Sequence, residues 1–167
     1  MRADKDHTDE QALAIYQEHL DSMTRALLSG DFEPFAARLA FPHQVVTSSD
    51  TFNIATREHS RKLFDDLHAS LKAEGITDVI RLAQEAVFVT PDEIVGTHVS
   101  HKMRHGERIM APYHNRMRFV RTQEGNWVET HSSNAIINKA GKFCIVTETP
   151  DNMPAPELHI HSERKPK

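Results

Sequence analysis

Residues 93–136 read EIVGTHVSHKMRHGERIMAPYHNRMRFVRTQEGNWVETHSSNAI. Valine, isoleucine, threonine and aromatic residues are frequent in this stretch, and two short glycine-containing segments, 105–106 and 123–125, interrupt it. Such a pattern is typical of β-strands joined by tight turns. The stretch therefore predicts three long antiparallel strands, over residues 93–104, 107–121 and 127–136.

Four polar side chains of this stretch fall where a half-buried sheet normally carries apolar groups. They are His98, Tyr113, Asn115 and His131. Polar groups buried in a sheet need hydrogen-bond partners. We therefore expect a polar-lined pocket on one face of the sheet.

The preceding part of the chain shows helical patterns and shorter strand patterns. Thr8 and Gln11 have the spacing of a capping box, and apolar residues then recur at helical spacing until Gly30, which predicts a helix over residues 9–29. Two further helices are predicted over residues 32–39 and 57–74, and strands over residues 44–47, 51–54 and 79–89.

Helices followed by a run of antiparallel strands indicate an α+β fold. Because long strands twist, we expect a curved antiparallel sheet that forms a cone closed by three N-terminal helices. This domain should span residues 1–139. Residues 140–167 should form a C-terminal edge segment, with a strand at 141–148, and a tail.

Composition excludes several classes of protein. The chain has 167 residues, enough for one domain with a core, and a net charge of −4 with dispersed basic residues, so no nucleic acid is expected as a partner. No apolar run approaches the ~20 residues of a membrane span. The absence of a signal-peptide pattern and the single cysteine, Cys144, predict a cytoplasmic protein.

Four short motifs carry a resemblance to a known superfamily. They are Leu28-Ser-Gly-Asp-Phe, Thr56-Arg-Glu-His, Met117-Arg-Phe and Gly125-Asn-Trp. Together with the order of elements, they resemble the cystatin-like superfamily of nuclear transport factor 2, ketosteroid isomerase and polyketide cyclase, over about residues 9–138. The resemblance implies a cone-shaped domain and a homodimer in which a second copy covers the outer face of the sheet.

The resemblance does not carry over the catalytic residues of the isomerases. The position of their oxyanion-hole tyrosine falls on Met23, and that of their aspartate base falls near Thr47, with Asp50 as the neighbouring carboxylate. The position of their second oxyanion donor falls on Asn115, whose amide can still donate a hydrogen bond. This comparison argues against ketosteroid isomerisation by the usual residues.

Hairpin geometry predicts which side chains share a face. If the turn at 105–106 contains two residues, His98 lies opposite Tyr113 and Gly96 lies opposite Asn115, and opposed residues project to the same face. The inward face should then carry His98, Ser100, Ala111, Tyr113, Asn115, Met117 and Phe119.

Two registers stay open for the last predicted strand, because a shift of one residue exchanges its two faces. A three-residue turn at 123–125 would direct three polar side chains inward: Glu129, His131 and Ser133. A two-residue turn at 124–125 would direct their neighbours inward: Thr130, Ser132 and Asn134. We favour the first register, because Gly125 suits a bulged turn.

The candidate catalytic residues are His98, Glu129 and His131, because a carboxylate beside a histidine adjusts a general base toward neutral pH. The expected binding residues are Tyr113, Asn115, Ser133, Met117, Phe119 and Met23. No metal site is expected, since the histidines between residues 98 and 105 do not face the same side of a strand.

Two functions stay open. The first is binding of a small apolar or aromatic ligand, with isomerase-, cyclase- or dehydratase-like acid–base chemistry that needs no cofactor. The second is a non-enzymatic homodimerisation or adaptor module with a filled cone. The sequence favours ligand binding, because the inward polar set is larger than a filled core needs.

Overall fold

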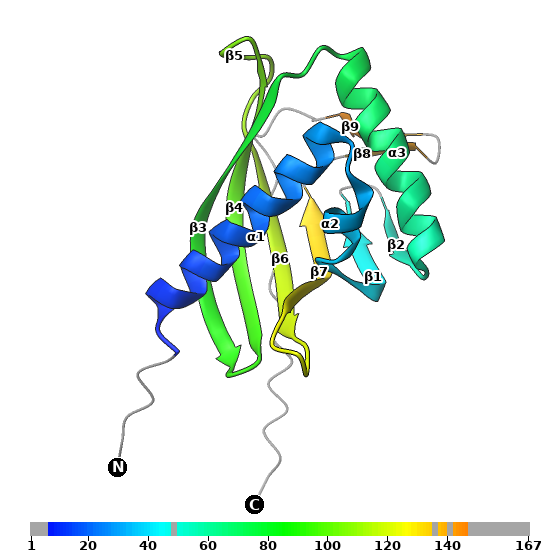
Figure 1. Cartoon of the computed structure of the whole chain (residues 1–167). Helices are drawn as coiled ribbons and strands as arrows, with labels where there is room; N and C mark the ends of the chain where they lie inside the picture. Colours follow the sequence, from blue (N-terminus) through cyan, green and yellow to red (C-terminus); the bar gives the residue numbers. More distant parts are fainter. Residues whose placement is uncertain (1–6, 48–49, 135–136, 140–141, 147–167) are drawn as a thin grey trace, which may run out of the picture.

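The structure is a computed structural model, and it describes residues 7–47 and 50–134, together with the backbone of residues 137–139 and 142–146. Three helices lie on one face of a curved sheet (Figure 1). They are α1 (Asp9–Ser29), α2 (Phe32–Ala36) and α3 (Arg57–Ala73). The strands of the sheet are β1 (Leu39–Val46), β2 (Thr51–Ile54), β3 (Asp78–Thr90), β4 (Glu93–Arg104), β5 (Glu107–Arg108), β6 (Tyr113–Arg121) and β7 (Trp127–Asn134). The predicted α+β class is confirmed.

The sheet is mixed and not entirely antiparallel. Its strand order is β2-β1-β7-β6-β4-β3, with β5 paired to β4. All neighbours run antiparallel except β1 and β7, which are parallel. The prediction of a purely antiparallel sheet is wrong at this one pairing, because turn signals identify neighbours joined by short loops and not strands that are distant in the chain.

Local signals predict the helices well. Thr8 Oγ1 accepts from the backbone N–H of Gln11 at 3.2 Å, Gln11 Oε1 accepts from the N–H of Thr8 at 3.0 Å, and Gly30 ends α1 with φ 74°. This capping box and the left-handed glycine confirm the predicted first helix at both ends. The second helix is shorter than predicted, because β1 already begins at Leu39.

The core between α1 and the sheet depends on one close approach. Tyr16 of α1 is fully buried beside Leu20, Ile94 and Phe119. A Cβ atom on Gly96 of β4 would lie 2.5 Å from the Tyr16 ring. Glycine is therefore needed at residue 96 for the tyrosine to lie flat on the strand. A second apolar cluster, which includes Phe32, Phe64 and Leu71, joins α2 and α3.

The first hairpin has the predicted inward face but not the predicted pairs. Next to the turn, Arg104 lies opposite Glu107, as a two-residue turn requires. Residues 109–112 then leave the ladder, so His98 lies opposite Asn115 and not opposite Tyr113. A shift of two residues keeps each side chain on its face. Ala111, which was expected inward, is exposed in the intervening segment.

The last strand uses both of the predicted registers. Near the turn Phe119 lies opposite Glu129, which is the three-residue-turn register, but Arg118 lies opposite His131, which is the alternative. A β-bulge at Thr130 separates the two. Across the bulge the inward positions of β7 become Glu129, Ser132 and Asn134. The favoured register is thus right for Glu129 and wrong for His131 and Ser133.

The last two described strands do not join the main sheet. Residues 137–139 and 142–146 form a separate two-stranded sheet, β8 (Ile137–Lys139) and β9 (Lys142–Val146), and not an edge of the main sheet. The Cys144 side chain and the predicted tail lie outside the described residues. None of the described helices is long and apolar enough to cross a membrane.

Candidate functional site

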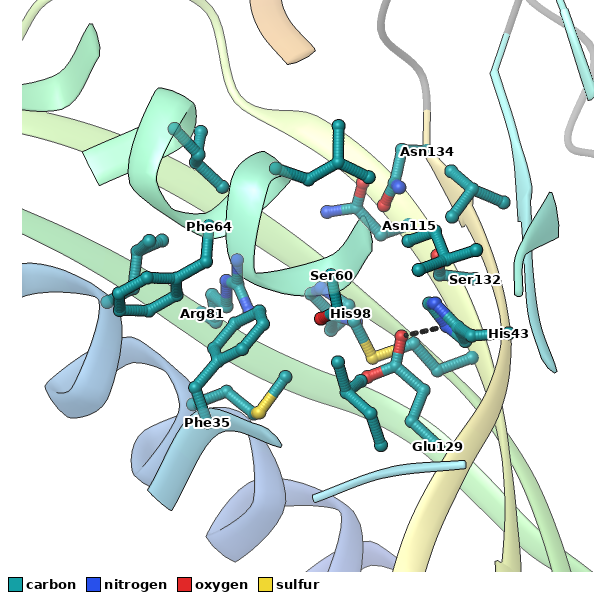
Figure 2. Close-up of a pocket in the computed structure, with 18 of the residues that line it drawn as sticks. Phe35, His43, Ser60, Phe64, Arg81, His98, Asn115, Glu129, Ser132 and Asn134 are labelled. Atoms are coloured by element: carbon teal, nitrogen blue, oxygen red, sulfur yellow. Dashed lines mark hydrogen bonds and ion pairs between the residues drawn. The ribbon is translucent and has the colours of Figure 1, made fainter. Parts of the chain in front are cut away.

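A cavity of about 100 Å³, partly open to solvent, lies between the inner face of the sheet and the helices (Figure 2). Helix residues such as Met23, Phe35 and Phe64 line its apolar side. The strands contribute its polar side, with His43, Arg81, His98, Asn115, Glu129 and Ser132. A mainly apolar cavity with a few convergent polar groups is the usual form of a small-molecule site.

Glu129 is the centre of a buried hydrogen-bonded cluster at the β1–β7 end of the cavity. Its side chain is 3% exposed, His19 Nε2 donates to Oε2 at 3.1 Å, and His43 Nε2 donates to Oε1 at 2.9 Å (Figure 2 shows the second bond). Burial raises the pKa of Glu129, but the hydrogen bonds from the two histidines outweigh burial and hold the pKa well below its usual range. Glu129 is therefore a carboxylate.

The hydrogen bonds to this carboxylate fix the tautomer of each neutral histidine. A carboxylate only accepts, so both Nε2 atoms carry hydrogen, and in the neutral form of either histidine the lone pair is on Nδ1. His43 Nδ1 and His19 Nδ1 are buried without a partner among the described residues. His43 lines the cavity, whereas the His19 ring lies against Phe119, with the ring centroids 4.2 Å apart. Of the two histidines that bond to Glu129, His43 is the one that lines the cavity.

His98 occupies a different environment on β4. Its Nδ1 lies 2.8 Å from the hydroxyl of Tyr16, and that hydroxyl lies 3.1 Å from the carbonyl of Gly96. The single hydroxyl hydrogen satisfies both contacts only if Tyr16 donates to Gly96 and accepts from His98 Nδ1–H. Burial, with the nearby positive charge of Arg81, lowers the pKa of His98 to about 3. His98 is therefore neutral, with a lone pair on Nε2.

Asn115, which lies at the position of an oxyanion donor in the resemblance, does not offer its amide hydrogens to the cavity. Asn115 Nδ2 donates to Ser100 Oγ at 2.7 Å, and Asn115 Oδ1 is buried without a partner among the described residues. Burial raises the pKa of the Tyr113 hydroxyl, so this phenol stays protonated. The open group of the asparagine is an acceptor, so it suits a ligand that donates a hydrogen bond there.

The structure brings most of the predicted site residues to the cavity. Those that line it are His98, Glu129, Tyr113, Asn115, Met117 and Met23. His131 and Ser133 do not, because the bulge turns them to the outer face, where His131 Nδ1 contacts Thr130 Oγ1 at 2.9 Å. Phe119 packs in the core against Tyr16 and His19 instead of lining the cavity.

Sequence reasoning missed four residues of the site. Tyr16 and His19 lie on the buried face of α1, where the apolar spacing favours an ordinary core assignment. His43 lies next to Pro42, where the residue pattern favours a loop over a strand. Arg81 lies on β3, and its inward position follows the alternation of the strand, which was the available signal.

No metal site accompanies these groups. His19, His43 and Glu129 bond to one another, and the described residues contain no group of three histidine, cysteine or acidic side chains that could hold a metal ion. The arrangement suits proton transfer and hydrogen bonding to an organic molecule.

Comparison of the sequence with protein-family models and with curated proteins finds no match. Solved structures do match the fold. A domain of unknown function with a cystatin-like fold from Nostoc punctiforme is 14% identical, with a TM-score of 0.59 over 77% of this chain and 78% of that one. A "putative ketosteroid isomerase" from Shewanella frigidimarina is 16% identical, with a TM-score of 0.56 over 72% and 94%.

A third structure, a "putative scytalone dehydratase" from Novosphingobium aromaticivorans, is 12% identical, with a TM-score of 0.52 over 72% of this chain and 80% of that one. At such identities the likeness concerns the fold and not the reaction. The fold of this chain is thus the cystatin-like α+β fold of the nuclear transport factor 2-like proteins, as its sequence resemblance implied.

Proposed function

We propose that the protein binds a small, mainly apolar molecule in the cavity and transfers a proton on it, with His43 as the general base. The observation that carries this proposal is the buried pair of His43 and Glu129 at the cavity wall, 2.9 Å apart. When His43 Nδ1 takes a proton, the carboxylate stabilises the imidazolium that forms. His19 acts through Glu129, as a positioning residue that holds the other carboxylate oxygen.

The two histidines of the cavity suit different tasks. A general base works best when its pKa lies near the operating pH. Since the pKa of His98 is about 3, this imidazole is a weak base, and we assign it to accept a hydrogen bond from the ligand. His43 has a carboxylate partner, which His98 lacks. The base is therefore assigned to His43.

The reaction class that fits is proton abstraction from carbon or oxygen, as in isomerisation, cyclisation or dehydration. Two structures of the same fold bear names of this kind, an isomerase and a dehydratase. At 12–16% identity these names assign no reaction to this chain, so its substrate class has to follow from its own residues. Proton transfer between His43 and a ligand needs no further co-reactant.

Binding is tested by filling the cavity. Ser132 lines it, and the neighbouring Ser133 lies on the opposite face of β7. A library of single-ring compounds is screened by ligand-observed NMR against the wild type, Ser132→Leu and Ser133→Leu. We expect hits that bind the wild type and Ser133→Leu but not Ser132→Leu. Equal binding to all three proteins, or no hit at all, would refute a ligand site in this cavity.

Proton transfer is tested on the hits that carry a C–H bond beside a carbonyl group. Exchange of this hydrogen in D₂O is followed by NMR. The substitution His43→Gln keeps a donor for Glu129 but removes the base, so exchange should slow by about 100-fold or more. His131→Gln, on the outer face, should exchange like the wild type. If His43→Gln retains the wild-type rate, the protein binds ligands without this base.

A second proposal concerns the outer face of the sheet. Four apolar side chains of β3 are exposed: Ile80, Leu82, Val87 and Val89. Exposed large apolar side chains gathered on one strand commonly mark an interaction surface. We propose that a second copy of the chain covers it. Light scattering should give a dimer for the wild type and for Glu124→Lys, and a monomer for Leu82→Lys. A dimer that binds no library compound would favour the non-enzymatic alternative.

A further inference from the structure

Arg81 is a cavity residue whose charge has no counter-ion among the described residues. It projects from β3 toward the cavity, between Phe35 and Phe64 in the view of Figure 2. Its Nε atom is buried without a hydrogen-bond partner, and the guanidinium makes no ion pair with any described residue. The neighbouring inward cation, Lys102 on β4, by contrast donates to Glu74 at 2.9 Å.

The position of Arg81 is fixed by its backbone. Gln17 of α1 donates from Nε2 to the carbonyl of Arg81 at 2.9 Å and accepts from the N–H of Ala83 at 2.8 Å. Across the sheet, Arg81 lies opposite Ser100, which in turn lies opposite Tyr113. The guanidinium therefore starts from a rigid point beside the polar wall of the cavity.

The guanidinium of Arg81 lacks a counter-ion among the described residues, and a bound anion would supply one. The guanidinium stays charged at every physiological pH; the residue is half-buried, and its buried Nε–H is costly unless it is paired. The other charged group of the cavity, Glu129, is already held on both oxygens by His19 and His43. Arg81 lies on β3 and Glu129 on β7, and β4 and β6 separate these two strands in the sheet, so the two charged groups belong to different ends of the cavity.

We infer that the ligand carries a carboxylate group, which Arg81 binds through its guanidinium, and that the ligand is a small single-ring carboxylic acid. This inference rests on the proposed function and names its substrate class. One guanidinium balances one negative charge, whereas a phosphate dianion would leave a second charge buried among apolar side chains. The cavity of about 100 Å³ is smaller than the roughly 150 Å³ of an apolar cavity that holds benzene, so the ligand has at most one ring, and the carboxylate uses the side of the cavity that opens to solvent.

The inference also orients the ligand. With its carboxylate on Arg81, the ring lies against the apolar side chains of α1 and α3, and the far end of the molecule reaches His43. His98 lies on β4, next to β3 in the sheet, so it belongs to the same end of the cavity as Arg81. The carboxylate thus anchors the ligand, and the proton is transferred at the opposite end.

The test compares matched acids and amides. Benzoate, cyclohexanecarboxylate and their primary amides are titrated into the wild type, Arg81→Met and Arg108→Met, with binding measured by calorimetry and NMR. Arg108 is an exposed arginine of β5, so its substitution changes net charge equally and leaves the cavity intact. Thermal unfolding of each variant confirms that it is folded.

We expect the wild type and Arg108→Met to bind each acid about tenfold to hundredfold more tightly than its amide, the range of a charge-assisted hydrogen bond. In Arg81→Met this preference should disappear while the amide still binds. Amides that bind the wild type as tightly as the acids, or an acid preference that survives in Arg81→Met, would overturn the inference and leave the proposed function standing. If neither acids nor amides bind the wild type, and the library screen also yields no hit, the proposed function itself falls.

Discussion

Each end of the cavity holds a buried histidine, and the partners of the two histidines differ. At the β1–β7 end His43 donates to the carboxylate of Glu129, at 2.9 Å. At the β3–β4 end His98 donates to the hydroxyl of Tyr16, at 2.8 Å, beside the positive charge of Arg81. A carboxylate favours an added proton on the imidazole, whereas burial next to a cation opposes it. This difference is why our proposal assigns the base to His43 and a neutral acceptor role to His98.

The largest expected loss of stability follows from removing the negative charge of Glu129 at the β1–β7 end. Glu129→Gln keeps the size of the side chain but leaves His19 and His43 without their common acceptor. A hydrogen bond to a buried charged group typically contributes about 1.5–3 kcal/mol, so the loss of the charge that holds both imidazoles should cost about 3–6 kcal/mol in urea unfolding. Glu124→Gln, on the exposed turn before β7, makes the same chemical change and should stay within about 0.5 kcal/mol of the wild type. Equal stabilities for the two variants would show that the cluster contributes nothing.

The second expected effect is a pH dependence of the free energy of unfolding, which arises from His98 at the β3–β4 end. The pKa of His98 is lowered to about 3 in the folded protein, so the unfolded chain binds this proton first as the pH falls. The contribution of His98 to the free energy of unfolding is therefore largest above pH ~6.5, the pKa of an unfolded histidine. It decreases as the pH falls toward the folded pKa, by about 2 kcal/mol between pH 6.5 and 5. Glu129, whose pKa is also lowered, adds its own loss only below pH ~4.3.

Urea unfolding at several pH values between 6.5 and 5 measures this slope. His98→Gln should reduce it to the contribution of His131, whose pKa burial also lowers, whereas His114→Gln, an exposed histidine of β6, should keep the wild-type slope. A slope that is unchanged in His98→Gln would mean that the folded protein accepts the proton at this histidine, and the contrast between the two ends would disappear.

The smallest expected loss of stability comes from removing the hydrogen bond between His98 and Tyr16, which fixes the His98 tautomer. Tyr16→Phe removes only the hydroxyl, leaves the Nδ1–H of His98 buried without an acceptor, and should cost about 1–2 kcal/mol. In a His98→Leu background the same change should cost less, because no imidazole is left unpaired. A cost that is identical in both backgrounds would show that the hydroxyl matters only to Gly96.

The elements that could be predicted are those set by local patterns. The capping box of Thr8 and Gln11, the glycine stop at Gly30 and the alternation of the meander depend on residues close in sequence, and the structure follows them. The parallel pairing of β1 with β7 joins strands about 90 residues apart, as the pair Leu39 and Glu129 shows. No turn signal reports such a contact.

The candidate site was predictable in part for the same reason. His98, Tyr113 and Asn115 follow from strand alternation, which survives a register error of two residues. His131 and Ser133 do not, because a single extra residue at Thr130 exchanges the faces. His43 was missed because β1 breaks its ladder with β7 between Leu39 and Gln44, so its inward position has no simple period.

The bulge at Thr130 has a practical consequence for anyone who redesigns this protein. Inward positions on β7 are three residues apart across the bulge, from Glu129 to Ser132, and two residues apart after it. A mutagenesis library built by counting every second residue from Glu129 would therefore diversify His131 and Ser133 and never touch the cavity. Randomising residues 129, 132 and 134 alters what the cavity accepts, while the outer positions of the same strand remain free for engineering solubility or assembly.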